Sequence, residues 1–238
     1  MTEQSYLIRP LFDKESSTWT YIVTDKVSRK SIIIDPVLEN RDRDLSLIDE
    51  MNIDLEAVIE THIHADHITA ASEIRKATNA KLVYGAKNAQ VDTADLFLDH
   101  EEIYELGNTQ IKTLFTPGHT TGCTSFYLNG TVFTGDALFI RGCGRTDFQG
   151  GSAKTLFESV RTQLFSLPDN TIVHPAHDYK GMVLSTINEE KLHNPRLKLS
   201  HTKDQFIKIM DNLNLPYPKK IDTAVPANLK SGQVEEQA

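Results

Sequence analysis

The chain has 238 residues, of which 39% are hydrophobic, so it is long enough to bury a sizeable core as one large domain or two small ones. Its net charge of −8 argues against general nucleic-acid binding, which requires a basic face. It has no run of 18 apolar residues, and residues 1–5 lack the basic and apolar regions of a secretory signal. With only two cysteines, Cys123 and Cys143, a disulfide scaffold is excluded and a cytoplasmic location is expected.

The first hundred residues predict short strands interspersed with helices. Apolar and β-branched runs indicate the strands, and apolar residues at helical spacing indicate the helices. Residues 88–100 show only a weak pattern and give no prediction. The expected strands are residues 5–12, 18–24, 31–34, 55–59 and 81–84, and the expected helices are residues 44–51 and 68–77.

The rest of the chain predicts two hairpins, a single strand and three helices. Gly107-Asn108 and Asn129-Gly130 are turn pairs between β-like runs. The tail from Pro216 holds three prolines and little periodicity, so we expect it to lie over the surface and to fray after Gly232. The expected strands are residues 102–106, 109–116, 124–128, 131–134 and 171–173, and the expected helices are residues 153–165, 184–192 and 202–213.

Residues 61–67 hold three histidines and one aspartate in the pattern H-x-H-x-D-H. The pattern follows a predicted strand and enters a predicted helix, which is where α/β proteins bind ligands and metals. The alternative is a polar loop with an ordinary helix N-cap at Asp66. A cap needs one such residue and not four, so we favour a binding site.

The same arrangement recurs along the chain, because His62, His119, Asp136 and His177 each follow the end of a β-like run. Strands of one sheet end at a common edge, so these side chains can converge. Any one of them alone would be a turn-capping aspartate or an ordinary histidine. Together with residues 61–67 they favour a metal site. The histidines not expected to be ligands are His100, His174, His193 and His201.

These residues resemble the metallo-β-lactamase superfamily. The resemblance rests on residues 61–67, Gly118-His119, Gly135-Asp136 and Ala176-His177-Asp178. It implies an α/β fold, the αββα sandwich of two mixed β-sheets flanked by helices. It also implies a single domain over residues 1–238, with a core at about 5–192 and a C-terminal helix and tail at 193–238.

A narrower resemblance is to the persulfide dioxygenases, also called sulfur dioxygenases or ethylmalonic-encephalopathy-type proteins. Its most specific part is the run from Gly135 to Gln149. The supporting segments are residues 175–179, 194–197, 212–216 and 224–228. The resemblance therefore covers nearly the whole chain.

This second resemblance implies one Fe(II) per chain, held by His62, His119 and Asp136. Two histidines and one carboxylate leave open positions for a substrate and O2, as in non-haem iron oxygenases. The residues alone do not decide between one metal and two. Four further ligand-type side chains would either hydrogen-bond the iron ligands or form a vacant second metal site, namely His64, Asp66, His67 and His177.

On the substrate side, two arginines separated by a glycine-rich turn are candidates for binding the carboxylates of glutathione, Arg141 and Arg145. Arg145 could equally pair with Asp147 to fix the loop. Cys143 is more simply a structural or pocket-lining thiol than a nucleophile, because no base lies beside it in the sequence. Tyr179 and Lys180 are further candidate contacts.

The function implied is an iron-dependent oxidation of glutathione persulfide by O2 to sulfite and glutathione, a sulfide-detoxifying reaction. The alternative is a hydrolase of the glyoxalase II type, in which two metals activate water to cleave a glutathione thioester. A non-catalytic metal-binding protein is a third hypothesis. The expected partners are small molecules, with neither nucleic acid nor membrane. A homodimer is expected only because dimers are the commonest symmetric assemblies. A sulfurtransferase that delivers sulfur would be a separate protein.

Overall fold

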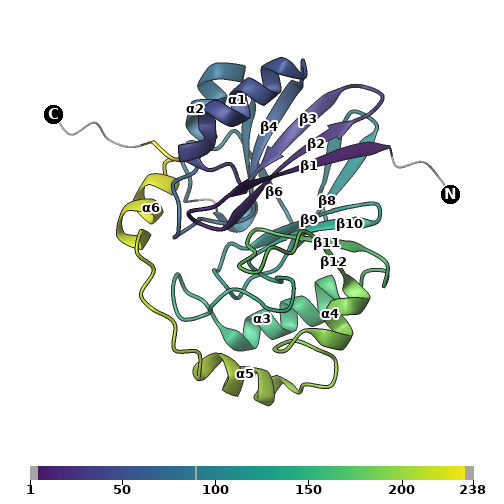
Figure 1. Cartoon of the computed structure of the whole chain (residues 1–238), viewed down its shortest axis with the longest axis vertical. Helices are drawn as coiled ribbons and strands as arrows, with labels where there is room; N and C mark the ends of the chain where they lie inside the picture. The colour runs from purple at the N-terminus through teal and green to yellow at the C-terminus, as the bar shows by residue number, and fades with distance from the viewer. Residues whose placement is uncertain (1–4, 89, 234–238) are drawn as a thin grey trace.

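Two six-stranded β-sheets pack face to face in the computed structural model, which describes residues 5–88 and 90–233 (Figure 1). The first sheet has the order β1-β2-β3-β4-β5-β6, and its strands are β1 (Tyr6–Asp13), β2 (Thr18–Asp25), β3 (Lys30–Ile34), β4 (Asp54–Glu60), β5 (Lys81–Gly85) and β6 (Leu96–Leu98). The second has the order β12-β11-β10-β9-β8-β7, and its strands are β7 (Ile103–Leu106), β8 (Thr109–Phe115), β9 (Thr124–Leu128), β10 (Thr131–Gly135), β11 (Ile172–Pro175) and β12 (Ser185–Thr186).

Helices cover the outer face of each sheet, which gives the expected αββα sandwich (Figure 1). The first sheet packs against α1 (Arg41–Glu50) and α2 (Ala71–Thr78). The second packs against α3 (Ala153–Ser159), which continues as the π-helical turn η3 (Val160–Leu164), and against α4 (Ile187–His193) and α5 (Lys203–Asp211). Short 3-10 turns are η1 (Leu38–Asn40) and η2 (Ala86–Asn88).

The central core lies between the two sheets. Tyr21, Ile32 and Ile59 from the first sheet meet Phe126 and Phe133 from the second, and all five side chains are fully buried. Two further apolar clusters fill the space between each sheet and its helices. The strands β3, β4 and β5 therefore have both faces covered, which explains why their sequences read as continuous apolar runs rather than alternating ones.

Parallel pairing sets where the strands end. β3, β4, β5 and β6 are mutually parallel, and β10 is parallel to β11. Carboxyl ends of parallel neighbours share one edge of a sheet. The loops that follow β3 and β4 therefore start side by side, and so do those that follow β10 and β11.

Two expected helices begin later than the sequence pattern indicates. The helix expected at residues 68–77 begins at Ala71, because the residues before it bond to the segment that follows β3. Leu38 N–H donates to Ile68 O, and Ala70 N–H donates to Pro36 O. The helix expected at residues 184–192 begins at Ile187, because the two residues before it pair with β11 as β12. Tertiary pairing overrides the local pattern in both places.

The expectation of an irregular surface tail was wrong between residues 221 and 228, which form α6 (Ile221–Asn228). Pro226 lies inside this helix, and a proline there removes one helical hydrogen bond. The helix is retained because Ala224 and Ala227 are buried, while Val225 packs on the outer cluster of the first sheet. The fraying expected after Gly232 concerns residues 233–238, of which 234–238 lie outside the described residues. The expected lack of a signal concerns residues 1–5, of which 1–4 lie outside them. Among the described residues, no helix is long and apolar enough to cross a membrane.

Asp25 ties the end of β2 to the second sheet and generates a pH-dependent stability. Its buried carboxylate accepts hydrogen bonds from Ser28 N–H (2.7 Å), Ser28 Oγ–H (2.7 Å) and Thr109 Oγ1–H (2.8 Å). Burial alone would raise the pKa of Asp25, but these hydrogen bonds lower it to about 2. The lowered pKa stabilises the fold above the unfolded-state value of about 3.9, and this stabilisation is lost as the pH falls towards about 2.

We therefore predict that Asp25→Asn lowers the free energy of unfolding at pH 7 by about 1.5–3 kcal/mol, the scale of hydrogen bonds to a charged group. The variant should also lose part of the wild-type decline in stability between about pH 4 and pH 2. Urea unfolding at a series of pH values measures both effects. The exposed Asp92→Asn serves as the matched control, and an Asp25→Asn profile that parallels the wild type would contradict the prediction.

Candidate metal centre

A buried aspartate holds the first residue of the loop formed by residues 61–67. Asp35, which directly follows β3, accepts hydrogen bonds from Thr61 N–H (2.7 Å) and Thr61 Oγ1–H (2.8 Å). Because the Thr61 hydroxyl hydrogen goes to Asp35, Thr61 Oγ1 is left to accept the Nδ1 hydrogen of His62 at 3.0 Å. His62 then presents the lone pair of its Nε2 atom, the form in which a histidine binds a metal.

His119 is oriented in the same way from the second sheet. It lies between β8 and β9, and its Nδ1 lies 2.6 Å from the carbonyl oxygen of Arg145, an acceptor only. The Nδ1 atom therefore carries the hydrogen, and Nε2 is free to bind a cation. Gly144 permits this approach, because a Cβ atom there would lie 2.8 Å from His119 Nδ1 and 2.7 Å from the Asp136 carbonyl oxygen.

Asp136 completes a group of three donors. It directly follows β10, and its Oδ2 lies 3.4 Å from His119 Nε2. One ligand atom each from His62, His119 and Asp136 lies within 4.8 Å of the others, although the residues come from loops of both sheets. The structure thus brings together the three side chains that the sequence predicts as ligands.

Two observations show that these residues fit a cation. The Oδ1 atom of Asp136 is buried without a hydrogen-bond partner, which is costly unless a positive charge or a proton is supplied. Burial lowers the pKa of His62 well below its usual value, and the neighbouring His64 and His119 lower it further. His62 is therefore neutral, as a metal ligand must be.

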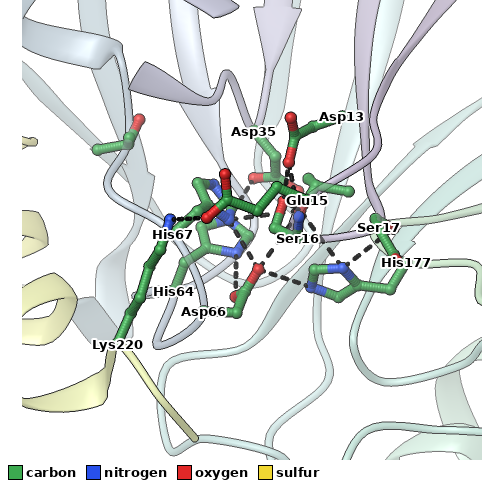
Figure 2. Close-up of polar contacts among 12 residues, drawn as sticks. Asp13, Glu15, Ser16, Ser17, Asp35, His64, Asp66, His67, His177 and Lys220 are labelled. Carbon is green, nitrogen blue, oxygen red and sulfur yellow. Dashed lines mark hydrogen bonds and ion pairs between the residues drawn. The ribbon is translucent and has the colours of Figure 1, made fainter. Parts of the chain in front are cut away.

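The remaining ligand-type residues, His64, Asp66, His67 and His177, lie close to one another (Figure 2). His64 Nε2 faces two buried carboxylates, at 3.2 Å from Asp35 Oδ1 and 3.4 Å from Glu60 Oε2. Burial alone would lower the pKa of His64, but Asp35 and Glu60 raise it well above its usual value. The Nε2 atom of His64 therefore pairs with these two acids.

Asp66 joins the other two histidines (Figure 2). Its Oδ2 lies 2.9 Å from His67 Nδ1 and 3.6 Å from His177 Nε2. Burial alone would raise the pKa of Asp66, but His177 and His67 hold it well below the usual range, so Asp66 is ionised. His177 Nδ1 is also 3.3 Å from the carbonyl oxygen of Ser17, in the loop between β1 and β2.

The same side chains form two further groups with metal-ligand spacing. One is His64, Asp66 and His67, and the other is Asp35, Glu60 and His64. The described residues therefore supply donors for a second cation, and the geometry alone does not select one metal over two.

A pocket of about 520 Å³ opens above the three-donor group. Its floor contains His119, Asp136 and His177. Apolar side chains form its walls, and basic residues lie on its lining, so it suits an anionic small molecule. The walls include Phe139, Ile140, Leu215, Pro216 and Pro218, and the basic residues are Arg141, Arg145, Lys180 and Arg196.

The two predicted arginines both bind acids of the chain itself. Arg141 contacts the buried Glu190 through Nη1 and lies 3.4 Å from Glu189. Arg145 holds Asp147 through two parallel hydrogen bonds of 2.6 and 2.7 Å and donates a third, of 2.8 Å, to Pro216 O. Arg145 thus makes the internal pair that the sequence offered as an alternative to substrate binding.

The other predicted contacts lie around the pocket as well. Cys143 is buried, and burial raises the pKa of its thiol to about 11, so it is protonated at neutral pH. Tyr179 stacks on His177, with ring centroids 6.0 Å apart, and Lys180 lies next to it on the lining. His174, which was not expected to be a ligand, instead stacks on Phe133 with ring centroids 5.4 Å apart.

Three residues that the structure places at the site were not predicted from the sequence. Arg196 lines the pocket and donates a 2.8 Å hydrogen bond to Cys143 O, although its segment entered only through the family resemblance. Asp35 follows a strand as the predicted ligands do, a signal that could have identified it. Asn228 contacts the loop of residues 61–67 from α6, and only the tertiary structure reveals this contact.

The fold and the ligand group match known proteins. Residues 13–177 match the metallo-beta-lactamase superfamily, which is more than half of the chain. The chain therefore belongs to the metallo-β-lactamase superfamily.

The similarity within this superfamily is closer and extends over nearly the whole chain. The chain is 47% identical to "Persulfide dioxygenase ETHE1, mitochondrial" of Mus musculus and 46% identical to that of Homo sapiens, in each case over 230 residues, 95% of this chain and 89% of the relative. The crystal structure of ETHE1 from Myxococcus xanthus aligns with a TM-score of 0.92 at 48% identity, covering 95% of this chain and 100% of that one. Within the superfamily, the chain belongs to the persulfide dioxygenase family.

The group of three donors predicts that Asp136 is needed for metal binding and that Asp66 is not. Asp136→Ala should abolish stoichiometric divalent-metal binding, because it removes the only carboxylate of that group. Asp66→Ala is the matched control and should retain one equivalent of metal. Metal analysis of both purified variants, with circular dichroism to confirm folding, measures the difference. Stoichiometric metal in Asp136→Ala would contradict the assignment.

Proposed function

We propose that this chain is an iron-dependent persulfide dioxygenase that oxidises glutathione persulfide. The observation that carries this proposal is its membership of the persulfide dioxygenase family across 95% of the chain, together with a group of two histidines and one carboxylate, of which His119 and Asp136 line the pocket. The overall reaction would convert glutathione persulfide, O2 and water to glutathione and sulfite, with release of two protons.

His62, His119 and Asp136 would hold a single iron(II). This donor set of two imidazoles and one carboxylate is the one that non-haem iron oxygenases use. When bound, iron(II) supplies open coordination positions and the redox chemistry that makes O2 reactive towards sulfur. Two imidazole ligands and one carboxylate would leave iron(II) with a net positive charge, which attracts an anionic persulfide.

The pocket residues would bind and orient the substrate. The pocket volume of about 520 Å³ lies in the range of small-molecule sites. Lys180 and Arg196 are the candidates for the two glutathione carboxylates, because Arg141 and Arg145 already bind acids of the chain. Phe139 and Tyr179 pack against His177 on the pocket lining and would limit the access of water to the reacting sulfur.

Cys143 would line the pocket and not attack the substrate. Its thiol is protonated at neutral pH because burial raises its pKa to about 11, and only the thiolate is a strong nucleophile. Its carbonyl oxygen instead accepts a hydrogen bond from Arg196, and its sulfur lies 3.8 Å from Met210 Sδ. The residue thus connects the pocket to the core around α5.

A dinuclear hydrolase of glutathione thioesters is the second candidate function. The observation that favours it is the group of His64, Asp66 and His67, which has the spacing of a second metal site next to the first. Two metals there could activate a water molecule for hydrolysis. A non-catalytic metal-binding protein is the third candidate, and it would bind the metal without turnover.

Location and assembly stay predictions. Both cysteines are free thiols, which fits a reducing compartment such as the cytoplasm, whereas the mammalian relatives are named as mitochondrial. A homodimer and a separate sulfurtransferase that supplies the persulfide are further expectations from the sequence.

The first test of the function combines metal analysis with oxygen uptake. We expect about one iron per chain and O2 consumption on addition of glutathione persulfide, with sulfite as the product. The same preparation should not cleave a glutathione thioester. Two zinc ions per chain with thioester cleavage would instead establish the hydrolase, and bound metal without turnover on either substrate would favour the non-catalytic protein.

A pair of variants tests whether Arg145 contacts the substrate. If Arg145 only fixes its loop through Asp147, then Arg145→Ala and Asp147→Asn should change the kinetics to the same extent. If Arg145 also binds a glutathione carboxylate, Arg145→Ala alone should raise KM about tenfold or more with iron retained. Equal KM values for the two variants would contradict substrate binding by Arg145.

A further inference from the structure

One side chain of the C-terminal helix contacts the loop that holds His62. Asn228 is the last residue of α6, and its side chain is only 2% exposed. Its Nδ2 donates hydrogen bonds to the carbonyl oxygens of His64 (2.9 Å) and His67 (2.8 Å), and its Oδ1 accepts one from Thr69 N–H (2.9 Å). A single amide thus bridges three backbone groups between His64 and Thr69.

The chemistry of these contacts requires an amide. Two backbone oxygens face Nδ2, and one backbone N–H faces Oδ1, so the opposite orientation would place Oδ1 against two acceptors. A carboxylate at this position would repel the same two carbonyl oxygens, and an aliphatic side chain would leave them without these donors. Asparagine satisfies all three partners at once.

The helix that carries Asn228 is itself held in place on both sides. Lys220, just before α6, is 3.0 Å from Glu15 Oε1 (Figure 2) and 3.0 Å from Glu39 Oε1. After the helix, Ser231 O accepts a hydrogen bond from Ser72 N–H at 3.0 Å. Gly232 approaches the loop so closely that a Cβ atom there would lie 2.0 Å from the Thr69 carbonyl oxygen. Asn228 is therefore presented to the loop from a fixed support.

The loop is fixed at both ends by these contacts. Asp35 holds its start through Thr61, and Asn228 holds its later part through His64, His67 and Thr69. His62 lies between the two anchors. The direction of its Nε2 atom depends on the backbone conformation that they set, and a fixed donor direction strengthens metal binding.

We propose that Asn228 is a positioning residue of the metal centre, so that the C-terminal helix sets the affinity of the site for its metal. This proposal rests on one part of the proposed function, namely that His62, His119 and Asp136 hold a divalent metal. Asn228 lies outside residues 13–177, the part of the chain that matches the superfamily. The metal centre of this protein is thus completed by a segment beyond the superfamily match.

The test compares metal affinity in variants of the full chain. Asn228→Asp keeps the shape and removes the donors, and Asn228→Ala removes the whole amide. Val225→Ala is the matched control, because it weakens the packing of α6 but leaves the amide in place. Asn212→Asp is the second control, since Asn212 also donates to a backbone carbonyl, that of Lys208.

Each protein is titrated with Co(II), and anaerobically with Fe(II), after circular dichroism and thermal melting. We expect both Asn228 variants to bind metal about 10- to 100-fold more weakly than wild type, the range for residues that orient metal ligands. The Co(II) absorption spectrum should also change. Hydrogen exchange of the backbone amides at residues 62–70 should be faster in the metal-free Asn228 variants. Both controls should keep the wild-type Co(II) spectrum and an affinity within about twofold.

Wild-type affinity and spectrum in both Asn228 variants would overturn the proposal. An equal loss of affinity in Val225→Ala would also overturn it, because the effect would then come from helix docking and not from the amide. If Asn228→Asp and Asn228→Ala do not fold, Asn228→Ser is titrated in their place, and unchanged affinity overturns the proposal. Metal titration needs no turnover, so wild-type protein that fails to consume O2 contradicts the proposed function and leaves this comparison intact.

Discussion

The contact between Asp35 and Thr61 is the constraint on which the site depends. A buried carboxylate is costly unless its oxygens are hydrogen-bonded, and Thr61 supplies two of those bonds. In return, Thr61 is fixed at the point where β4 ends, and its hydroxyl oxygen orients His62. Because Asp35 ends the neighbouring parallel strand β3, the pairing of these two strands determines where the first metal ligand lies.

Oxygen atoms of the protein orient both histidines of the three-donor group. The Nδ1 atom of His62 faces Thr61 Oγ1, and that of His119 faces the carbonyl oxygen of Arg145, so both rings turn Nε2 towards Asp136. His64 instead faces buried acids. The number of metals bound, and with it the choice between oxygenation and hydrolysis, depends on whether the donors outside this group leave their present partners.

The C-terminal part of the chain serves both the substrate side and the metal side. The segment between α5 and α6 contributes Leu215, Pro216 and Pro218 to the pocket wall, where Arg145 binds the Pro216 carbonyl oxygen. Further on, Asn228 holds the loop that carries His62. In a protein with a net charge of −8, Lys180 and Arg196 also place positive side chains on the lining of this pocket, beside the carboxylates of Asp66, Asp136 and Asp178.

Much of the architecture and the identity of the candidate ligands follow from local patterns. The apolar runs of β3 and β4 predict buried strands, and the H-x-H-x-D-H pattern after β4 indicates a metal site, because few other roles need so many such residues together. The resemblance of residues 135–149 identifies the family. Each of these signals lies within a short stretch of chain, so a reading of neighbouring residues is enough to find it.

Other features depend on partners distant in sequence, and only the tertiary structure decided them. Arg141 was a predicted substrate contact, but the fold places Glu190 beside it. The helix α6 was not predicted because Pro226 opposes a helix that packing against the first sheet stabilises. The role of Asn228 arises from contacts with residues up to 164 positions away. The sequence by itself determined the family and the candidate ligands, whereas tertiary packing decided which charges are already paired and which residues hold the ligands in place.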